Sequence, residues 1–485
     1  MPPLPLHFRS ATELARLLRA RKVTASALLE ECLDQYAKHN DQLNAVIVTD
    51  IERAKKAAAA SDRRLKKGKP IGPLDGVPMT AKESFDMTGT PSTWGVPRFR
   101  DNIATSDAVA ITRLTDAGAV IYGKTNVPLM LADWQSFNEI YGTTSNPWDV
   151  KRSPGGSSGG SAVALATGMS ALEVGSDIGA SIRNPAHYCG VYGHKPTYGI
   201  VPYRGHHLPG IVHPSDISVA GPLARSARDL ALMMKLLAGT DGVEARGLTL
   251  NLPPAKQKSL KEFRVAVMVT DEQSEVDLPV QDLIGKLTTF LGKRVKKIST
   301  TARPAFSSKE AMDVYIALLR SATSRRQTDA EFAVNAAHVA QLDPLDDSYL
   351  AKMMRAYVLP HRNWLFYNER RHQLRLLWDQ FFDDWDVMIC PAAASAAFPH
   401  DQLGERHERT IEVNGRQVPT TDQLFWAGYS GGYYLPSTIA PMGLTSQGLP
   451  AGIQIIARQY CDYTSIRFAE LLEKEYGGFV PPPGY

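Results

Sequence analysis

Residues Ser153 to Gly168 read SPGGSSGGSAVALATG, in which glycines and serines lead directly into alanine-rich sequence typical of a helix. Only glycine allows such close backbone approach and unusual dihedral angles. The segment therefore indicates a tight turn that gathers N–H groups and hydroxyls near the start of a helix. Strand-like and helix-like pieces alternate around it, from residue 72 to about 240, which favours an α/β core.

This glycine–serine segment allows three interpretations. A phosphate-binding loop needs GxxxxGK[ST], and no lysine follows the glycines. A flexible linker would fit the composition, but the flanking sequence is typical of folded protein. Gly155, Ser157 and Gly159 match the nucleophile-elbow pattern G-x-S-x-G, which needs a strand leading into the turn. Here NPWDVKRSP, ending in Pro154, indicates a turn instead, so the pattern favours something other than the elbow.

A second serine lies in EVGSDIGASIRNPAHYCGVYGHKPT, residues 173 to 197. Small residues before Ser181 would let successive backbone N–H groups point at a developing oxyanion. A serine hydroxyl is a poor nucleophile unless a base takes its proton. His187 and His194 are near in sequence, but their aromatic and glycine-rich surroundings are more typical of core packing.

Lys82 is the alternative base, in GPLDGVPMTAKESFD, residues 72 to 86. A single lysine is most often solvated. Short apolar neighbours here indicate partial burial, which disfavours the ammonium form and lowers the pKa. A buried Lys82 would therefore be a neutral amine that can accept a proton.

Together these three segments resemble the amidase signature family. In that family the lysine of PLxGxPxxxK, the first serine of GGSSGG and the serine of G-[ST]-D-x-G-G-S-I-R form the catalytic triad. The matching positions are Lys82, Ser157 and Ser181. The resemblance covers nearly the whole chain, including YGTTSNPWD and the C-terminal LPSTIAPMGLTSQGLPAGIQIIAR.

The resemblance implies an α/β fold with a large mixed β-sheet core covered by helices on both faces. We expect residues 1–485 to form a single domain. Within it, residues 10–67 form an N-terminal helical segment, 72–240 the signature core, and 308–385 a variable helical region expected to cover the active site. Gly199 to Val201 is a further expected strand, and Asn414-Gly415 predicts a type I′ hairpin.

The resemblance also implies roles for residues around the triad. Ser181 would be the nucleophile, Ser157 the proton relay and Lys82 the base, with a cis bond between Gly156 and Ser157. The expected oxyanion hole consists of the N–H groups of Ile178, Gly179, Ala180 and Ser181, and the expected supporting residues are Ser158, Asp177 and Arg183. The family usually has glycine where Ala180 stands, so the hole survives if Ala180 need not adopt positive φ.

The substrate is less defined. Met130, Leu131 and Trp134 resemble the acyl-pocket segment of the family, and their apolar character favours hydrophobic or aryl substrates, although core packing explains them equally well. A second aromatic group forms either the pocket rim or part of the core: Phe425, Trp426, Tyr429, Tyr433 and Tyr434. The expected activity is hydrolysis of aryl or alkyl amides, with ester or carbamate (urethanase) cleavage included. The alternative is a glutamine-hydrolysing subunit of a tRNA-dependent amidotransferase, and a non-catalytic binding protein fits poorly because the whole triad is retained.

The composition excludes several other classes. Of 485 residues, 44% are hydrophobic, and the net charge of +4 is too small and dispersed to favour nucleic acid binding. Four separated cysteines without a CxxC pair predict no zinc site and a reducing cytoplasm. Neither a metal nor an organic cofactor is expected. The N-terminus does not resemble a signal peptide, and residues 161–172 are too short to span a bilayer, so we expect no membrane partner. The sequence leaves a homodimer open.

Overall fold

The computed structural model describes residues 4–485. Its strands form an eight-stranded sheet in the order β10-β9-β11-β15-β14-β7-β8-β6, a three-stranded sheet in the order β1-β3-β2, and two short hairpins. The large sheet is mixed, because β9 pairs in parallel with β10 and β11 while the other neighbours are antiparallel. The strands are β1 (Val46–Thr49), β2 (Pro78–Lys82), β3 (Val120–Thr125), β4 (Phe137–Asn138), β5 (Gly142–Thr143), β6 (Leu172–Asp177), β7 (Tyr192–Lys195), β8 (Val219–Ala224), β9 (Arg264–Val267), β10 (Lys297–Ser299), β11 (Val387–Pro391), β12 (Thr410–Val413), β13 (Arg416–Pro419), β14 (Ser437–Leu444) and β15 (Pro450–Ile456).

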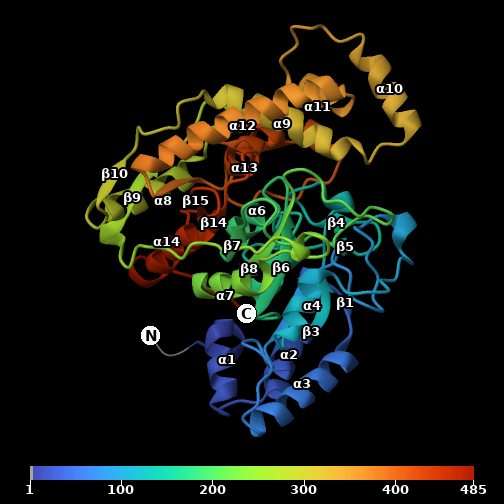
Figure 1. Ribbon diagram of the computed structural model, residues 1–485, viewed down its shortest axis with the longest axis vertical. Coiled ribbons are helices and arrows are strands. Elements are labelled where there is room, and N and C mark those ends of the chain that lie inside the picture. Colours follow the sequence, from blue (N-terminus) through green and yellow to red (C-terminus); the bar gives the residue numbers. More distant parts are fainter. Residues whose placement is uncertain (1–3) are drawn as a thin grey trace.

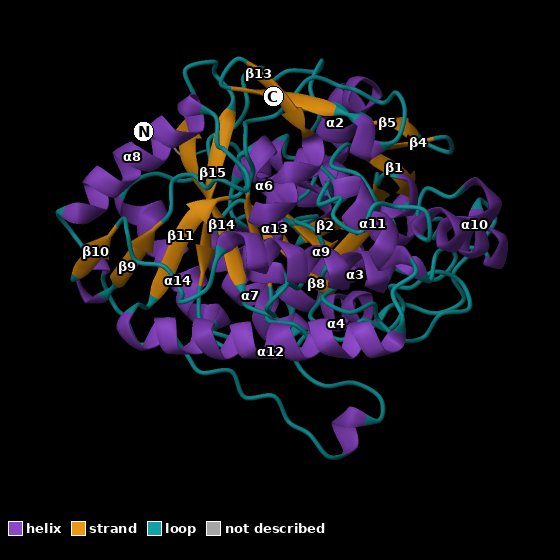
Figure 2. Ribbon diagram, turned by 90° about the horizontal axis from the view of Figure 1, so that it is seen from above, coloured by secondary structure: helices purple, strands orange, loops and turns teal. Residues whose placement is uncertain are grey.

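Helices pack against both faces of the large sheet, which confirms the predicted mixed α/β architecture (Figures 1 and 2). The helices are α1 (Ala11–Arg19), α2 (Ala25–Leu43), α3 (Ile51–Lys66), α4 (Val109–Asp116), α5 (Gly159–Ala166), α6 (Arg183–Cys189), α7 (Ala227–Leu237), α8 (Leu278–Gly292), α9 (Ser308–Ser324), α10 (Asp329–Val339), α11 (Tyr349–Tyr357), α12 (His361–Asp384), α13 (Leu424–Gly431) and α14 (Asp462–Glu475).

The expectation that residues 10–67 are helical throughout is wrong at one place. Ser10 caps α1 by accepting a hydrogen bond from the Glu13 N–H. Between α2 and α3, however, residues 46–49 form β1, which pairs with β3. The run VIVT is β-branched and apolar, and pairing with a strand distant in sequence overrides the helical pattern on either side.

Two other local expectations have opposite outcomes. Residues 199–201 form a turn, and the nearest strand is β7, which ends at Lys195. The predicted hairpin is confirmed: β12 and β13 pair around Asn414 and Gly415, whose φ angles of +51° and +73° match a type I′ turn.

The two sheets meet where the chemistry-bearing segments lie. The Thr80 N–H of β2 donates to Ser170 Oγ, and the Ala171 N–H donates to the Pro78 carbonyl, just before β6 begins. These bonds hold β2 beside β6. The carboxyl ends of β2 and β6, at Lys82 and Asp177, therefore lie at the same edge.

The expected helical region of residues 308–385 consists of α9 to α12. In Figure 1 these yellow and orange helices form a layer at the top of the molecule, with α10 projecting from its edge. Tyr315 of α9 lies against Gly428 of α13, where a Cβ would overlap the tyrosine ring. The Tyr315 hydroxyl also donates to the Ile178 carbonyl at 3.2 Å, which ties this helical layer to the segment before Ser181. That the whole chain forms a single domain stays a prediction.

No helix within residues 4–485 is long and apolar enough to cross a membrane. Four free cysteines occur, of which Cys32, Cys189 and Cys390 are buried. The predicted cytoplasmic location is not tested by these observations.

The contact between Gly428 and Tyr315 gives a stability prediction. Gly428→Ala should lower the free energy of unfolding by about 1–3 kcal/mol, because the added methyl overpacks the α9–α13 contact. Gly285→Ala is the matched control, since Gly285 lies exposed within α8, where an added methyl would meet open space. It should stabilise the protein by up to about 1 kcal/mol. Urea unfolding of both variants measures this, and equal effects would contradict the packing role of Gly428.

Candidate active site

Lys82 ends β2 and is completely buried. Its Nζ donates to Ser157 Oγ at 2.7 Å and to Ser176 Oγ at 2.9 Å. Within the described chain, no carboxylate lies within salt-bridge distance of this nitrogen. A structural lysine usually faces water or pairs with a carboxylate. Lys82 is instead bound only by two hydroxyls and a carbonyl, away from water.

Burial lowers the pKa of Lys82 to about 7, although Asp177, Glu173 and Glu83 oppose this shift through their charges. At neutral pH a substantial fraction of Lys82 is therefore the free amine. A free amine can accept a proton from the hydroxyl that it contacts, which an ammonium cannot.

Ser157 lies in the turn before α5 and is 1% exposed. The Gly156–Ser157 peptide bond is cis, as the family resemblance implies, and Gly155 has φ of +86°. No strand leads into this turn: residues 153–158 are loop, and the chain enters it from an isolated bridge at Arg152. The nucleophile-elbow interpretation of G-x-S-x-G is thereby excluded.

Ser181 lies between β6 and α6 and is 5% exposed. The Ser158 N–H donates to the Ser181 carbonyl at 3.0 Å, which joins the two serine segments directly. Among residues 4–485 no hydrogen bond links the Ser157 and Ser181 hydroxyls, but both side chains line one cavity. The predicted triad is thus brought together, with Lys82 and Ser157 already in contact.

Asp177 and Arg183 form the buried ion pair that flanks Ser181. Arg183 Nη2 and Nε donate to the two Asp177 oxygens at 2.9 and 3.0 Å. Arg183 also donates to Ser430 Oγ and Gln454 Oε1, and so anchors the segment to α13 and β15. Burial alone would raise the pKa of Asp177, but the Arg183 guanidinium beside it holds that pKa below its ordinary value.

The expected oxyanion hole needs one correction. Ala180 has φ of +69°, in the region that favours glycine, whereas the four-donor hole is expected only if Ala180 avoids a positive φ. Its N–H donates to Asp177 Oδ1 at 2.9 Å and is not free for a ligand. In the described chain, the N–H groups of Ile178, Gly179 and Ser181 have no hydrogen-bond partner. Three donors therefore remain where four are expected.

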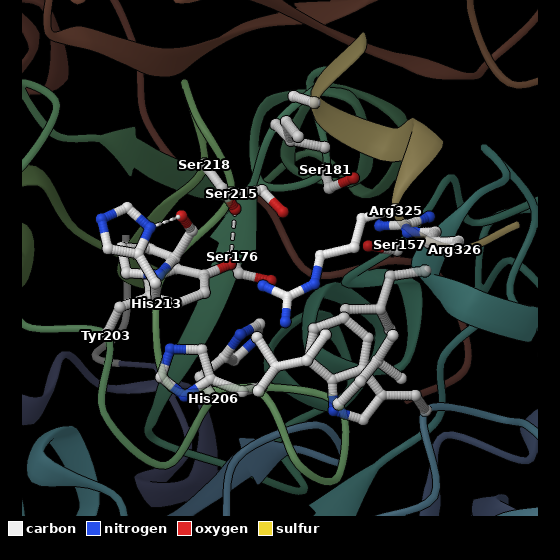
Figure 3. A pocket seen from close by; sticks show the side chains of 18 residues that line it. Ser157, Ser176, Ser181, Tyr203, His206, His213, Ser215, Ser218, Arg325 and Arg326 are labelled. Carbon is white, nitrogen blue, oxygen red and sulfur yellow. Dashed lines mark hydrogen bonds between the residues drawn. The ribbon is translucent and has the colours of Figure 1, made fainter. Parts of the chain in front are cut away.

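Two cavities meet at Ser181. The first, which we call the histidine cavity, contains Ser157, Ser176 and Ser181 on one side. Figure 3 shows these serines facing the cavity together with its other polar side chains. Those other polar residues are Tyr203, His206, His207, His213, Ser215, Ser218, Arg325 and Arg326.

The second cavity, which we call the tryptophan cavity, opens on the Gly179 side of Ser181. Its apolar residues are Leu131, Ala132, Trp134, Ile178, Leu319 and Leu424, and its polar residues are Asp133, Arg320, Thr323, Arg326 and Arg406. Trp134 is fixed in place because its Nε1 donates to the Gly179 carbonyl at 2.8 Å. Leu131, Ile178, Ser181 and Arg326 line both cavities.

The predicted substrate residues divide between cavity and core. Leu131 lines both cavities and Trp134 lines one of them, but Met130 lines neither. Met130 packs instead against a small cluster that includes Trp94 and Val127. Four members of the second aromatic group belong to the core, as one of its two interpretations holds, because Phe425, Trp426, Tyr429 and Tyr433 are each at most 3% exposed. The fifth, Tyr434, is half-buried, stacks on Tyr198 and lines neither cavity.

The two histidines considered as alternative bases have structural partners. His187 bonds through its ring nitrogens with the Gly452 backbone and the Ser395 carbonyl. His194 bonds with Thr438 and Asp462. Neither lines the cavities at Ser181, so the core interpretation of both is confirmed.

Sequence reasoning misses several residues of the site. Ser176 lies within the second serine motif, but nothing in the sequence indicates that its hydroxyl contacts Lys82. Outside the three motifs lie His206 in a loop, Arg320, Arg325 and Arg326 in or just after α9, and Arg406 at the start of a short 3-10 helix. Within residues 4–485 no cluster of three or more potential metal-ligating side chains occurs.

The chain is similar to known proteins in both sequence and fold. The family model described as Amidase matches residues 27–465. The chain is 31% identical to an acylamidase of Rhodococcus erythropolis, over 96% of this chain and 95% of that protein. It is 30% identical to a glutamyl-tRNA(Gln) amidotransferase subunit of Anaeromyxobacter sp. (strain K), over 98% and 99%. The crystal structure of a bacterial aryl acylamidase of the amidase signature family superposes with a TM-score of 0.80 at 25% identity, covering 97% of each chain.

The Asp177–Arg183 pair gives a second stability prediction. Arg183→Met should lower the free energy of unfolding by about 3–5 kcal/mol, because it leaves a buried carboxylate without its partner. Arg204→Met is the matched control, because the Arg204 side chain is 63% exposed in its pair with Asp241. It should cost no more than about 1 kcal/mol. Thermal and urea unfolding compare the two, and a similar loss in both would contradict the anchoring role of Arg183.

Proposed function

The chain belongs to the amidase signature family and hydrolyses carbon–nitrogen bonds of small-molecule amides, and on this basis we propose that Ser181 is its nucleophile, Ser157 its proton relay and Lys82 its base. One observation carries the proposal. The buried Lys82 amine, with a pKa of about 7, donates to Ser157 Oγ at 2.7 Å, and this hydroxyl opens into the same cavity as Ser181.

The acylation step uses these three groups in sequence. Ser181 Oγ attacks the carbonyl carbon, and its proton passes to Ser157 as the Ser157 proton passes to the Lys82 amine. When the tetrahedral intermediate collapses, the C–N bond breaks and the leaving amine takes a proton from Ser157. Ser157 recovers a proton from the Lys82 ammonium, so Lys82 returns to its neutral form and Ser181 carries the acyl group.

Deacylation reverses the relay with water as nucleophile. Water attacks the Ser181 ester and gives its proton to Ser157, which passes its own to Lys82. The ester bond then breaks, and the proton returns through Ser157 to Ser181 Oγ as the carboxylic acid leaves. The unpartnered N–H groups of Ile178, Gly179 and Ser181 stabilise the oxyanion in both halves, and each such donor contributes about 3 kcal/mol.

The relay also gives each cavity a role. The leaving nitrogen must come within hydrogen-bond reach of Ser157 Oγ, and Ser157 lines only the histidine cavity. The leaving amine therefore occupies the histidine cavity. The acyl group occupies the tryptophan cavity, whose apolar residues include Leu131, Trp134 and Leu424. This assignment favours aryl or alkyl amides, and it also admits esters and carbamates, whose carbonyls undergo the same attack.

A glutamine-hydrolysing subunit of a tRNA-dependent amidotransferase is the second candidate, because one relative at 30% identity is named as an amidotransferase subunit. Such a subunit would release ammonia from glutamine and would need partner chains to use it. The apolar side of the tryptophan cavity favours the stand-alone amidase.

The first test is amine release by the purified chain from matched anilide and aryl carbamate substrates, with glutamine as a third substrate. We expect arylamine release that Ser181→Ala abolishes, and an acyl-enzyme burst when the reaction is followed on the millisecond scale. Release that survives in Ser181→Ala would show that the nucleophile is wrong. Ammonia from glutamine without anilide hydrolysis would favour the amidotransferase function.

The pKa of Lys82 predicts the pH dependence. Below pH 7 the ammonium form dominates and cannot act as a base, so kcat/KM for the anilide should rise about tenfold per pH unit toward neutrality. Above a midpoint near pH 7 it should become constant. Lys82→Met should lower kcat/KM and remove this midpoint, whereas an unchanged profile in that variant would exclude Lys82 as the base.

A further inference from the structure

The two cavities at Ser181 are lined by four arginines: Arg320, Arg325, Arg326 and Arg406. None of them has a carboxylate within salt-bridge distance anywhere in residues 4–485. Arg320 is 8% exposed, its Nη2 donates to the Tyr349 hydroxyl, and its Nε has no partner within the described chain. Arg406 lies over the Trp134 ring, with its guanidinium carbon 5.5 Å from the ring centroid.

Three other buried arginines of this protein each form an ion pair with an aspartate. Arg183 pairs with Asp177 at 2.9 Å, Arg371 with Asp216 at 2.6 Å, and Arg409 with Asp133 at 2.6 Å. A buried guanidinium is costly without an opposite charge, and these three have one. Arg225 is buried without a carboxylate, but its guanidinium donates to four backbone carbonyls. Around Ser181, Arg320 is buried, Arg326 and Arg406 are half-buried and Arg325 is exposed, and no carboxylate pairs with any of them among residues 4–485. Their positive charge is therefore available to something that enters the cavities.

The acidic residues near these arginines are already engaged. Asp177 accepts hydrogen bonds from Arg183 and three backbone N–H groups. Asp133, the carboxylate of the tryptophan cavity, accepts from Arg409. The residues that line the histidine cavity include no aspartate or glutamate. Burial raises the pKa of Asp133, and the charges of both Arg406 and Arg409 oppose this rise, so Asp133 also partly balances Arg406. Both cavities nevertheless combine apolar surface with positive charge, and Arg326, which lines both, has no carboxylate partner among residues 4–485.

Arg326 has the central position, because it lines both cavities and follows directly after α9 and Arg325. In Figure 3, Arg325 and Arg326 lie at the edge of the histidine cavity beside Ser157 and Ser181. A guanidinium there can bind a carboxylate through two parallel hydrogen bonds. It would do so in cavities that Ser181 also lines.

We propose that the preferred substrates are amides that carry a carboxylate, and that Arg326 is the specificity-determining residue that binds it. The inference deepens the proposed function and depends on it. Leu131, Trp134 and Leu319 accommodate the apolar part of the substrate, while Arg326, with Arg320 or Arg325, binds its charged end. The carboxylate lies on the acyl group if it occupies the tryptophan cavity, and on the leaving amine if it occupies the histidine cavity.

Two pairs of substrates distinguish these positions. The acyl pair is glutaryl-4-nitroanilide and its neutral methyl ester, and the amine pair is N-butyryl-4-aminobenzoate and N-butyryl-4-aminobenzamide. We expect the wild-type chain to prefer the charged member of one pair by about tenfold or more in kcat/KM, and less so at 1 M NaCl. The pair that shows the preference identifies the cavity that holds the carboxylate.

The variants test Arg326 itself. Arg326→Gln should remove most of this preference, reducing it about tenfold or more, because it removes the charged partner of a hydrogen-bonded pair. Arg326→Lys should restore part of it, since lysine keeps the charge but not the two parallel donors. Arg362→Gln, an exposed arginine of α12, is the control and should keep both activity and preference.

Binding without turnover gives a second measurement. Glutarate should raise the Tm of the wild-type protein and of Arg362→Gln but not that of Arg326→Gln, and neutral glutaramide should raise none of them. Equal kcat/KM within both pairs, together with no effect of glutarate on Tm, would overturn the inference. Hydrolysis of the neutral anilide that still depends on Ser181 would then leave the proposed function standing.

Discussion

The site depends on one contact, the 2.7 Å hydrogen bond between the Lys82 amine and Ser157 Oγ in a region closed to water. A lysine in water is an ammonium and cannot accept a proton at pH 7. Burial removes the solvation that stabilises the ammonium, and its pKa falls to about 7. The fold must therefore hold a lysine in its interior without giving it a carboxylate partner.

The architecture meets this constraint by placing two strand ends and one tight turn around the amine. β2 delivers Lys82, β6 delivers Ser176, and the turn before α5 delivers Ser157. Burial raises the pKa of the nearby Glu173 to about 8, although hydroxyl and backbone hydrogen bonds oppose the shift. This carboxyl is therefore largely protonated at pH 7, which weakens the charge through which it opposes the lowered pKa of Lys82. Asp177, which does keep its charge, is turned toward Arg183. The same pair also fixes the backbone that carries Ser181.

The resemblance to the amidase signature family, carried by the glycine spacing, the lysine among apolar residues and the second serine motif, is sufficient to predict the fold class and that Lys82, Ser157 and Ser181 lie together. It is insufficient at Ala180, whose left-handed conformation follows from the bond between its N–H and Asp177. Met130 is expected in the pocket from its position alone, but its backbone turns it toward the Trp94 cluster. Arg326 carries no local signal, since its importance comes from the absence of a carboxylate partner among residues 4–485, and only the folded chain reveals which charges are paired.

The most direct test of this account is the titration of Lys82 by NMR of protein labelled with ¹³C at the lysine ε-carbons. A difference spectrum against Lys82→Met assigns the signal, which is necessary because burial also lowers the pKa of Lys124 to about 8 and of Lys195 to about 7. We predict a midpoint near pH 7 for Lys82 in the free enzyme. A midpoint at about pH 10, the ordinary value for an exposed lysine, would contradict the claim that burial makes Lys82 the base.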